Sequence, residues 1–228
     1  MTATAPPPVA GPPGPTTDDG EPRGTPGARA VAPVAMAGGA LAAGVVAGGC
    51  ALLTLRPAVL GAVADPTVAV VVLFSALLAV GVGWPGVAGG AGDGPGAART
   101  GHGRAPAPTV AAAVALGVAA FAVGRVLGGG RAPAPFAVRL VALNSLAAVA
   151  EEAFFRRLAY GVLSASGPAA AVAGTAVLFA VVHVTVYGAW VLPIDLAAGL
   201  VLGWQRWATG SWLAPAATHV VANLLVMV

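Results

Sequence analysis

The second half of the chain carries a few ionisable side chains within otherwise apolar sequence. After residue 108 the only acids are Glu151, Glu152 and Asp195, and the only histidines are His183 and His219. An ionisable residue at the centre of a lipid-embedded helix costs at least ~2.5 kcal/mol, so those that occur there usually serve a function. Carboxylates and imidazoles are the groups that proteins use for general acid–base chemistry. These residue types indicate a polar site inside a membrane.

The string EEAFFRR at residues 151–157 contains the first candidate group. Glu152 and Arg156 are four residues apart on a helix, with the acid N-terminal to the base, which is the favourable order for an ion pair. This pair would neutralise Glu152. Glu151 lies about 100° around the helix and is left unpaired by this local partner. A carboxylate in a low-dielectric cleft gains proton affinity, as a general base requires.

The two histidines lie on later helices. Phe179 precedes His183 by four residues, and Asn223 follows His219 by four, so His219 and Asn223 share one helix face. Taken alone, a buried histidine is more often a satisfied contact between helices, and an acid–arginine string is more often an interfacial charge cluster. Their combination in a half-chain with almost no other polar side chains favours a site. Asp195 follows Pro193 as either a pocket residue or a helix-capping carboxylate, and we leave it outside the expected catalytic set.

Composition determines which solvent surrounds these helices. The chain has 228 residues, of which 58% are hydrophobic and only 8% are charged, against roughly a quarter charged in soluble domains. We therefore expect an all-α, polytopic transmembrane helix bundle. The single cysteine, Cys50, excludes an intrachain disulfide. All 11 basic residues are arginine, and the Ala/Gly/Pro/Val bias is typical of a GC-rich bacterial genome.

The apolar runs divide the chain into four regions. We expect a disordered Pro/Gly-rich tail at 1–33, two transmembrane helices in 34–84, a low-complexity loop at 85–108, and further transmembrane helices in 109–228. The pattern predicts about seven spans, joined by short turns near residues 166–168, 188 and 210–211 that make successive helices antiparallel. The expected spans are 34–55, 67–84, 109–127, 136–163, 169–187, 190–207 and 212–228.

Arginine positions predict the orientation of a multi-pass protein of the cell membrane. With a cytoplasmic N-terminus, seven arginines lie on the cytoplasmic side and four outside, in agreement with the positive-inside rule. The cytoplasmic set is Arg23, Arg29, Arg99, Arg104, Arg156, Arg157 and Arg206, and the outer set is Arg56, Arg125, Arg131 and Arg139.

The chemistry-bearing residues form three motifs in a recognisable order. They are EExxxR at Glu151–Arg156, FxxxH at Phe179–His183, and HxxxN at His219–Asn223. In order and spacing they resemble the CAAX-protease and bacteriocin-processing (CPBP, or Abi) family of intramembrane proteases. The resemblance covers about residues 138–228, which would form the protease core.

This resemblance implies an intramembrane endopeptidase that hydrolyses peptide bonds of a membrane-associated protein or peptide. Carried over to this chain, Glu151 would activate water with help from His183, and His219 and Asn223 would hold the oxyanion. Glu152 and Arg156 would then be structural, holding the motif helix at the interface. Membrane lipid is the expected surroundings, and no nucleic-acid partner is expected.

Two alternatives remain at this point. The family is often labelled metalloprotease, and Glu151, His183 and His219 could ligate zinc. The chain has no HExxH motif and asparagine is an uncommon zinc ligand, so we favour glutamate catalysis without a cofactor. A non-proteolytic transporter or bacteriocin-immunity scaffold could retain the same polar residues, although residues 1–135 contain no second copy of EExxxR or HxxxN.

Overall fold

The computed structural model describes residues 28–84, 105–128 and 137–227. This part of the chain forms seven continuous helical segments and contains no strand, which confirms the all-α prediction. The segments are α1 (Ala28–Gly61), α2 (Pro66–Gly83), α3 (Ala107–Leu127), α4 (Val138–Glu152) continued by a π-helix (Ala153–Ala159) and α5 (Tyr160–Leu163), α6 (Pro168–Tyr187), α7 (Leu192–Thr209) and α8 (Leu213–Leu225).

The helix boundaries lie close to the predicted ones except at both ends of α1, which was expected at 34–55 and continues to Gly61. Helix α1 begins at Ala28, so residues 28–33, which we expected in the tail, are its first residues. Alanine, which recurs in this stretch, is the strongest helix former. The rest of the predicted disordered tail, and residues 85–104 of the predicted loop, lie outside the described residues.

The turns between the later helices follow from proline and glycine. Pro168 and Pro66 occupy the first turns of α6 and α2, where a missing N–H costs nothing. Gly188 (φ 87°) ends α6 and Gly210 (φ 66°) ends α7, in backbone conformations that favour glycine. These short joints are at the predicted places and make α6, α7 and α8 successive antiparallel neighbours.

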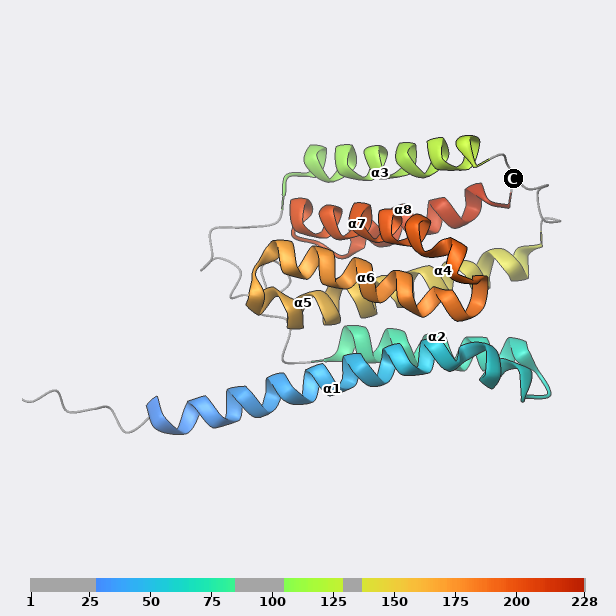
Figure 1. The fold of residues 1–228 in the computed structure, drawn as a ribbon. Helices are drawn as coiled ribbons and strands as arrows, with labels where there is room; N and C mark the ends of the chain where they lie inside the picture. Colours follow the sequence, from blue (N-terminus) through green and yellow to red (C-terminus); the bar gives the residue numbers. More distant parts are fainter. Residues whose placement is uncertain (1–27, 85–104, 129–136, 228) are drawn as a thin grey trace, which may run out of the picture.

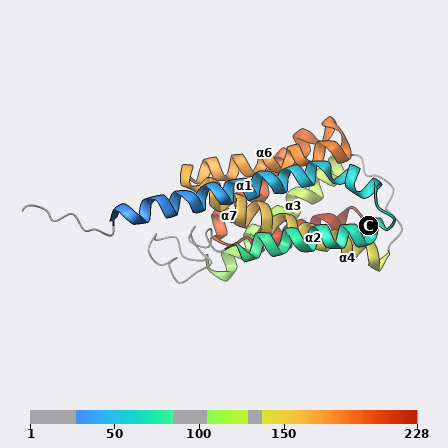
Figure 2. The same ribbon diagram turned by 90° about the horizontal axis from the view of Figure 1, so that it is seen from below.

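The helices pack as one bundle in which the middle elements carry the motifs. Helices α1 and α2 cover one face and α3 covers the opposite face, with α4–α8 between them (Figure 1). Seen from below, α1 runs along α6 and α2 runs along α4 (Figure 2), in agreement with their contacts. Each of the three motifs is therefore surrounded by other helices.

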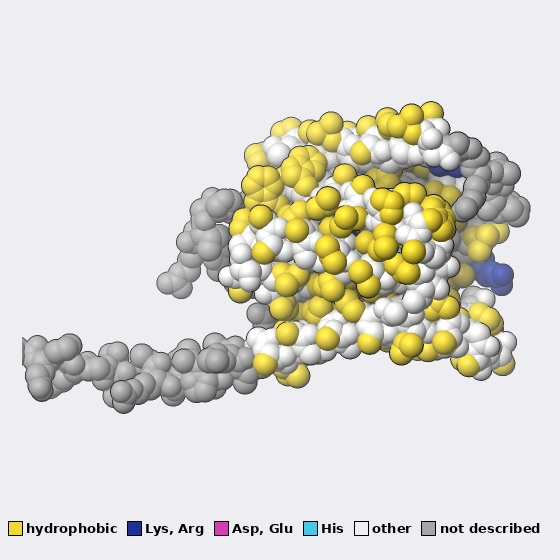
Figure 3. Space-filling model, viewed as in Figure 1, with side chains coloured by type: hydrophobic (Ala, Val, Ile, Leu, Met, Phe, Trp, Pro, Cys, Tyr) yellow, Lys and Arg dark blue, Asp and Glu magenta, His cyan; other side chains and the backbone are white. Residues whose placement is uncertain are grey.

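Among the residues that the structure describes, four helices are long and apolar enough to cross a membrane: residues 38–61 of α1, α2, α3 and α6. The π-helical segment and α7 carry arginines that are buried inside the bundle, Arg156 and Arg206. Hydrophobic side chains spread over the visible outer face of the bundle, as expected for a surface in contact with lipid (Figure 3). The chain is a multi-pass membrane protein.

Close packing surrounds the π-helical segment. Phe154 and Phe155 are fully buried, and their rings meet edge to face at 5.1 Å between centroids. The Phe154 ring packs on Gly49 of α1, where a side chain would collide with it. Gly81 of α2 approaches the backbone of Ala153 so closely that an added Cβ would lie 2.7 Å from its carbonyl carbon. Helices α1 and α2 thus clamp the first motif from outside.

Candidate active site

The first motif lies in the interior of the bundle. Glu151 is 5% exposed, and both Glu152 and Arg156 are fully buried. The backbone changes from α-helix to π-helix directly after Glu152. Such wide turns are rare and occur frequently at functional sites. Glu151, Glu152 and Arg156 are therefore covered by other helices and are not charges on the outer surface of the bundle.

The predicted ion pair between Glu152 and Arg156 is confirmed. Arg156 Nη1 donates to Glu152 Oε1 at 3.2 Å, and Nη2 donates to the carbonyl oxygen of Gly199 on α7 at 3.2 Å. The guanidinium also lies 4.7 Å from the centroid of the Phe179 ring, within cation–π range. Arg156 therefore joins the first motif, the second motif and α7.

Glu152 has a second partner that the spacing did not predict. His219 Nδ1 lies 2.9 Å from the same Glu152 Oε1 atom that Arg156 contacts. Because an ionised carboxylate only accepts, this geometry assigns the Nδ1 proton to His219 and fixes its ring. A hydrogen bond thus joins the third motif to the first. It links the fully buried side chain of Glu152 to the nearly fully buried side chain of His219.

Glu151 points to a different set of groups from those of Glu152. Its Oε1 atom lies 3.8 Å from His183 Nε2 and 3.5 Å from Arg56 Nη1. As expected, Arg156 leaves Glu151 unpaired, but a distant partner that the spacing did not predict is present, because α1 packs along α6 and brings Arg56 into the bundle. The available signal was an arginine near the end of an apolar span.

His183 is held in one orientation by its own motif. Its Nδ1 atom lies 2.7 Å from the carbonyl oxygen of Phe179, which can only accept, so Nδ1 carries a proton, and Nε2 lies towards Glu151. The rings of Phe179 and Tyr187 lie 4.5 and 5.9 Å from the imidazole centroid on either side. The FxxxH spacing thus has a structural reason in the i, i+4 contact between Phe179 and His183.

Asp195, which we left outside the catalytic set, lies next to the site. Its Oδ2 atom is 3.7 Å from His183 Nδ1, and within the described part of the chain this buried oxygen has no hydrogen-bond partner. The carboxylate stands in the first turn of α7. The signal was present in the sequence, since Asp195 is one of only three acids after residue 108.

Asn223 lies one turn beyond His219 on the side of α8 that packs against α4. Its Nδ2 atom donates to the carbonyl oxygen of Asn144 at 3.4 Å. Asn144, which sequence reasoning did not single out, anchors its own side chain to the carbonyl oxygen of Leu140. The structure thus brings Glu151 and His183 together, ties His219 to Glu152, and places Asn223 against the backbone of α4.

Glu151, His183 and His219 do not converge on one point where a zinc ion could lie. Among the described residues, no group of three or more His, Cys, Asp and Glu side chains is arranged to hold a metal ion. His219 turns Nδ1 to Glu152, while Glu151 faces His183 and Arg56. The arrangement therefore does not fit a zinc centre with Glu151, His183 and His219 as its three protein ligands.

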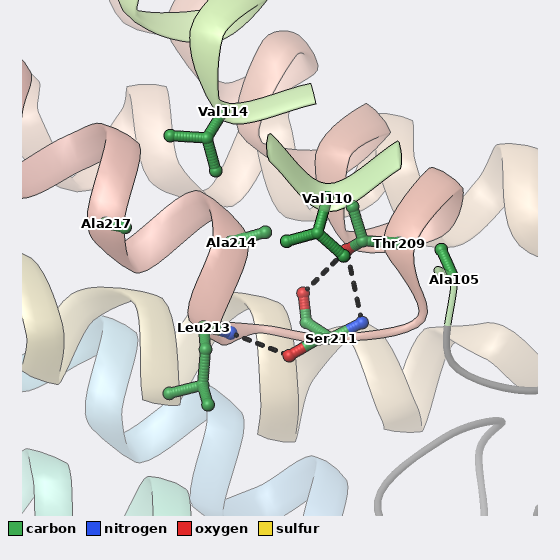
Figure 4. A pocket seen from close by; sticks show the side chains of 8 residues that line it. All are labelled: Ala105, Val110, Val114, Thr209, Ser211, Leu213, Ala214 and Ala217. Atoms are coloured by element: carbon green, nitrogen blue, oxygen red, sulfur yellow. Dashed lines mark hydrogen bonds between the residues drawn. The ribbon is translucent and has the colours of Figure 1, made fainter. Parts of the chain in front are cut away.

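A pocket of about 280 Å³ lies elsewhere, between α3 and the turn from α7 to α8 (Figure 4). Its polar groups are already bonded: Thr209 Oγ1 donates to the Ser211 carbonyl oxygen, and Ser211 Oγ accepts from the Leu213 N–H. Its other lining residues are apolar, namely Ala105, Val110, Val114, Ala214 and Ala217. This pocket contains none of the motif residues and offers no catalytic group.

Comparison with known families agrees with this site. Residues 133–225 match the family model described as type II CAAX prenyl endopeptidase Rce1-like, which confirms the resemblance seen in the three motifs. The match spans less than half of the chain, includes every motif residue, and excludes α1, α2 and α3. No curated protein and no solved structure matches the chain. The family supports a membrane protease of the CAAX prenyl endopeptidase type.

Proposed function

We propose that the protein is an intramembrane endopeptidase in which Glu151 activates a water molecule for attack on a peptide bond. The observation that carries this proposal is the approach of Glu151 Oε1 to His183 Nε2, 3.8 Å, inside an otherwise apolar bundle. A spacing of this size accommodates a shared water that reaches both groups with modest adjustment. Both side chains are fixed by contacts of their own, as catalytic groups need to be.

The proposed reaction moves one proton in two steps. Glu151 accepts a proton from water while the water oxygen bonds to the substrate carbonyl carbon, with His183 Nε2 accepting a hydrogen bond from the water. The tetrahedral intermediate then collapses, the carbon–nitrogen bond breaks, and the carboxylic acid of Glu151 returns the proton to the leaving amine.

We assign the oxyanion to the third motif. With Nδ1–H donating to Glu152, His219 in its imidazolium form would present Nε2–H as a charged donor to the oxyanion. The Asn223 amide, one turn away, would supply a second donor by exchanging its 3.4 Å contact with Asn144 for the substrate. In this assignment Glu152 and Arg156 position His219 and do not touch the substrate.

The substrate we propose is a membrane-associated protein or peptide that enters the bundle from lipid. The description of the matching family names a CAAX prenyl endopeptidase, which implies prenylated CAAX substrates. The amino-acid composition of this chain, however, is typical of a bacterial protein, and prenylated substrates are not expected in bacteria. Two quenched fluorogenic peptides distinguish these cases: one ends in a farnesylated CAAX box, and the other has the same sequence without the farnesyl group. The proposed reaction uses no cofactor.

Glu151→Gln tests the proposal. It retains the size of the side chain and removes the base, so cleavage of whichever peptide the wild type cuts should fall by roughly 100- to 10,000-fold. The protein is reconstituted in vesicles, and thermal unfolding checks that the variant is folded. Arg139→Gln, at an exposed position on α4, is the control and should retain activity.

Near-wild-type cleavage by Glu151→Gln would exclude Glu151 as the base. Absence of cleavage by the wild type on both peptides, with proton- or solute-coupled transport in the same vesicles, would favour the transporter. A folded chain with neither activity would favour a non-proteolytic scaffold.

A further inference from the structure

Arg56 contacts the proposed base from outside the three motifs. It lies on α1, which the family match does not include. Its Nη1 atom is 3.5 Å from Glu151 Oε1, and the exposed fractions of the two side chains are 11% and 6%. The guanidinium lies 5.8 Å from the centroid of the Phe74 ring on α2. A helix that is not part of the protease core thus supplies a charge to the centre of the site.

A buried carboxylate needs such a partner. Moving an ionised carboxylate out of water is unfavourable unless nearby charges or hydrogen bonds compensate for the lost hydration. On the same helix, Arg156 is bonded to Glu152. From α6 and α7, His183, Tyr187 and Asp195 face the same region, and none of them is a permanent cation.

Neighbouring contacts fix the location of Arg56. Two residues earlier, the carbonyl oxygen of Thr54 accepts a hydrogen bond from Thr185 Oγ1 of α6 at 2.8 Å. Leu53 is 1% exposed and belongs to the same hydrophobic core as Phe74 and Phe179. The end of α1 is therefore anchored beside the second motif, and the arginine side chain reaches Glu151 from this anchored backbone.

We propose that Arg56 is a positioning residue for Glu151 and that α1 is consequently part of the active site. The guanidinium compensates the buried negative charge and holds Oε1 on the side of His183, where the attacking water is bound. This proposal rests on the proposed function, because Arg56 acts through Glu151 and does not touch the substrate.

The test compares Arg56→Gln, Arg56→Lys and the exposed control Arg139→Gln in the full chain reconstituted in vesicles. With the fluorogenic peptide that the wild type cleaves, Arg56→Gln should lower kcat by roughly 10- to 150-fold, the range expected for one hydrogen bond to a charged group. KM should change little, because the substrate itself is not contacted. Arg56→Lys retains the charge and should recover most of kcat, while Arg139→Gln should match the wild type.

A double-mutant cycle with Glu151→Gln adds a measurement that does not depend on activity. If Arg56 compensates Glu151, the double variant should melt at a higher temperature than Arg56→Gln alone, because it has no uncompensated carboxylate. Should Arg56→Gln fail to fold, the double variant should fold. A double variant that remains as unstable as Arg56→Gln would overturn the proposal in favour of a packing role.

The kinetic outcomes are equally decisive. A kcat for Arg56→Gln equal to that of Arg139→Gln, or the same loss of kcat in the Lys and Gln variants, would overturn the positioning role. A wild-type chain that cleaves neither peptide but shows thermal coupling between positions 56 and 151 would overturn the proposed function. The two residues would then form only a structural ion pair.

Discussion

One carboxylate oxygen, Glu152 Oε1, accepts from two cationic or potentially cationic side chains, those of Arg156 and His219. The arginine comes from the same helix and the histidine from α8, so the stability of the bundle and the orientation of a proposed oxyanion donor depend on the same atom. The i, i+4 spacing predicted the arginine. Only the packing of α8 against α4 brings in the histidine.

Arg156→Ala should destabilise the fold. The fully buried Glu152 would lose its cationic partner, and breaking one side of a buried pair typically costs about 3–5 kcal/mol. The carbonyl oxygen of Gly199 would also lose its donor. Thermal unfolding in detergent measures the loss, with the exposed Arg139→Ala as a control that should melt like the wild type. Equal melting temperatures for the two variants would contradict the buried pairing.

Resistance to chelators is the second expectation at this scale. In the glutamate mechanism the third motif donates hydrogen bonds, so Asn223→Ala should reduce kcat by about 100- to 1,000-fold. Strong chelators should leave the purified wild-type enzyme active, and metal content should be the same in both proteins. One zinc ion per chain, with activity lost on chelation and restored by zinc, would replace this mechanism and leave the family assignment intact.

At the scale of elements, the apolar runs predicted the seven helices and the glycine turns between α6, α7 and α8. These features depend on local sequence: span length, proline in a first turn, and glycine at positive φ. The π-helix at Ala153–Ala159 has no comparable local signal, since AFFRRLA is compatible with an ordinary α-helix. It was therefore not predicted.

The partners that come from distant helices were also missed. Arg56 and Asp195 reach Glu151 and His183 only because α1 and α7 pack on α6, and helix order along the chain does not determine that packing. Five of the polar residues that the motifs singled out are buried, namely Glu151, Glu152, Arg156, His183 and His219. The motifs did not indicate other buried polar side chains, such as those of Gln205 and Arg206. The motif spacing also did not identify how the carboxylates and imidazoles divide between two neighbouring clusters, one at Glu151 and one at Glu152.

Gly81→Ala tests how closely α2 must approach the first motif. The added Cβ would lie 2.7 Å from the Ala153 carbonyl carbon, so the helices must separate, at a cost of roughly 1–3 kcal/mol. Gly83→Ala is the matched control on the same helix, because no atom lies within 4 Å of its Cβ position. In that variant, alanine should be neutral or slightly stabilising. A melting temperature for Gly81→Ala as high as that of Gly83→Ala would contradict the close approach.

At the scale of the whole molecule, the site lies towards one end of the bundle. Arg56 is near the end of α1, His183 is in the last two turns of α6, and Asp195 is in the first turn of α7. These helix ends lie on the same side of the bundle as the C-terminal end of α8, opposite the beginning of α1 (Figure 1). The site therefore lies nearer the side of the membrane that is opposite the beginning of α1.

Burial changes the arginine count behind the predicted orientation. Arg156 and Arg206 are 0% and 4% exposed, so they are internal partners and do not act as loop charges. Arg56 of the predicted outer set is internal by the same criterion, because it pairs with Glu151. Without these three, five arginines remain on the predicted cytoplasmic side against three outside. The preference for a cytoplasmic N-terminus is therefore retained. Within the described residues, α1 begins and α8 ends at opposite ends of the bundle (Figure 1).

Epitope tags at each end of the full chain measure both properties in intact cells. We expect the N-terminal tag to be protected from external protease and the C-terminal tag to be cleaved. An odd number of crossings would place the two termini on opposite sides of the membrane, and the remaining excess of arginines favours a cytoplasmic N-terminus. Permeabilised cells, in which both tags should be cleaved, are the control. The reverse pattern would invert the orientation and place the end of the bundle that holds the site on the cytoplasmic side. Equal protection of both tags in intact cells would contradict seven crossings, since it requires an even number.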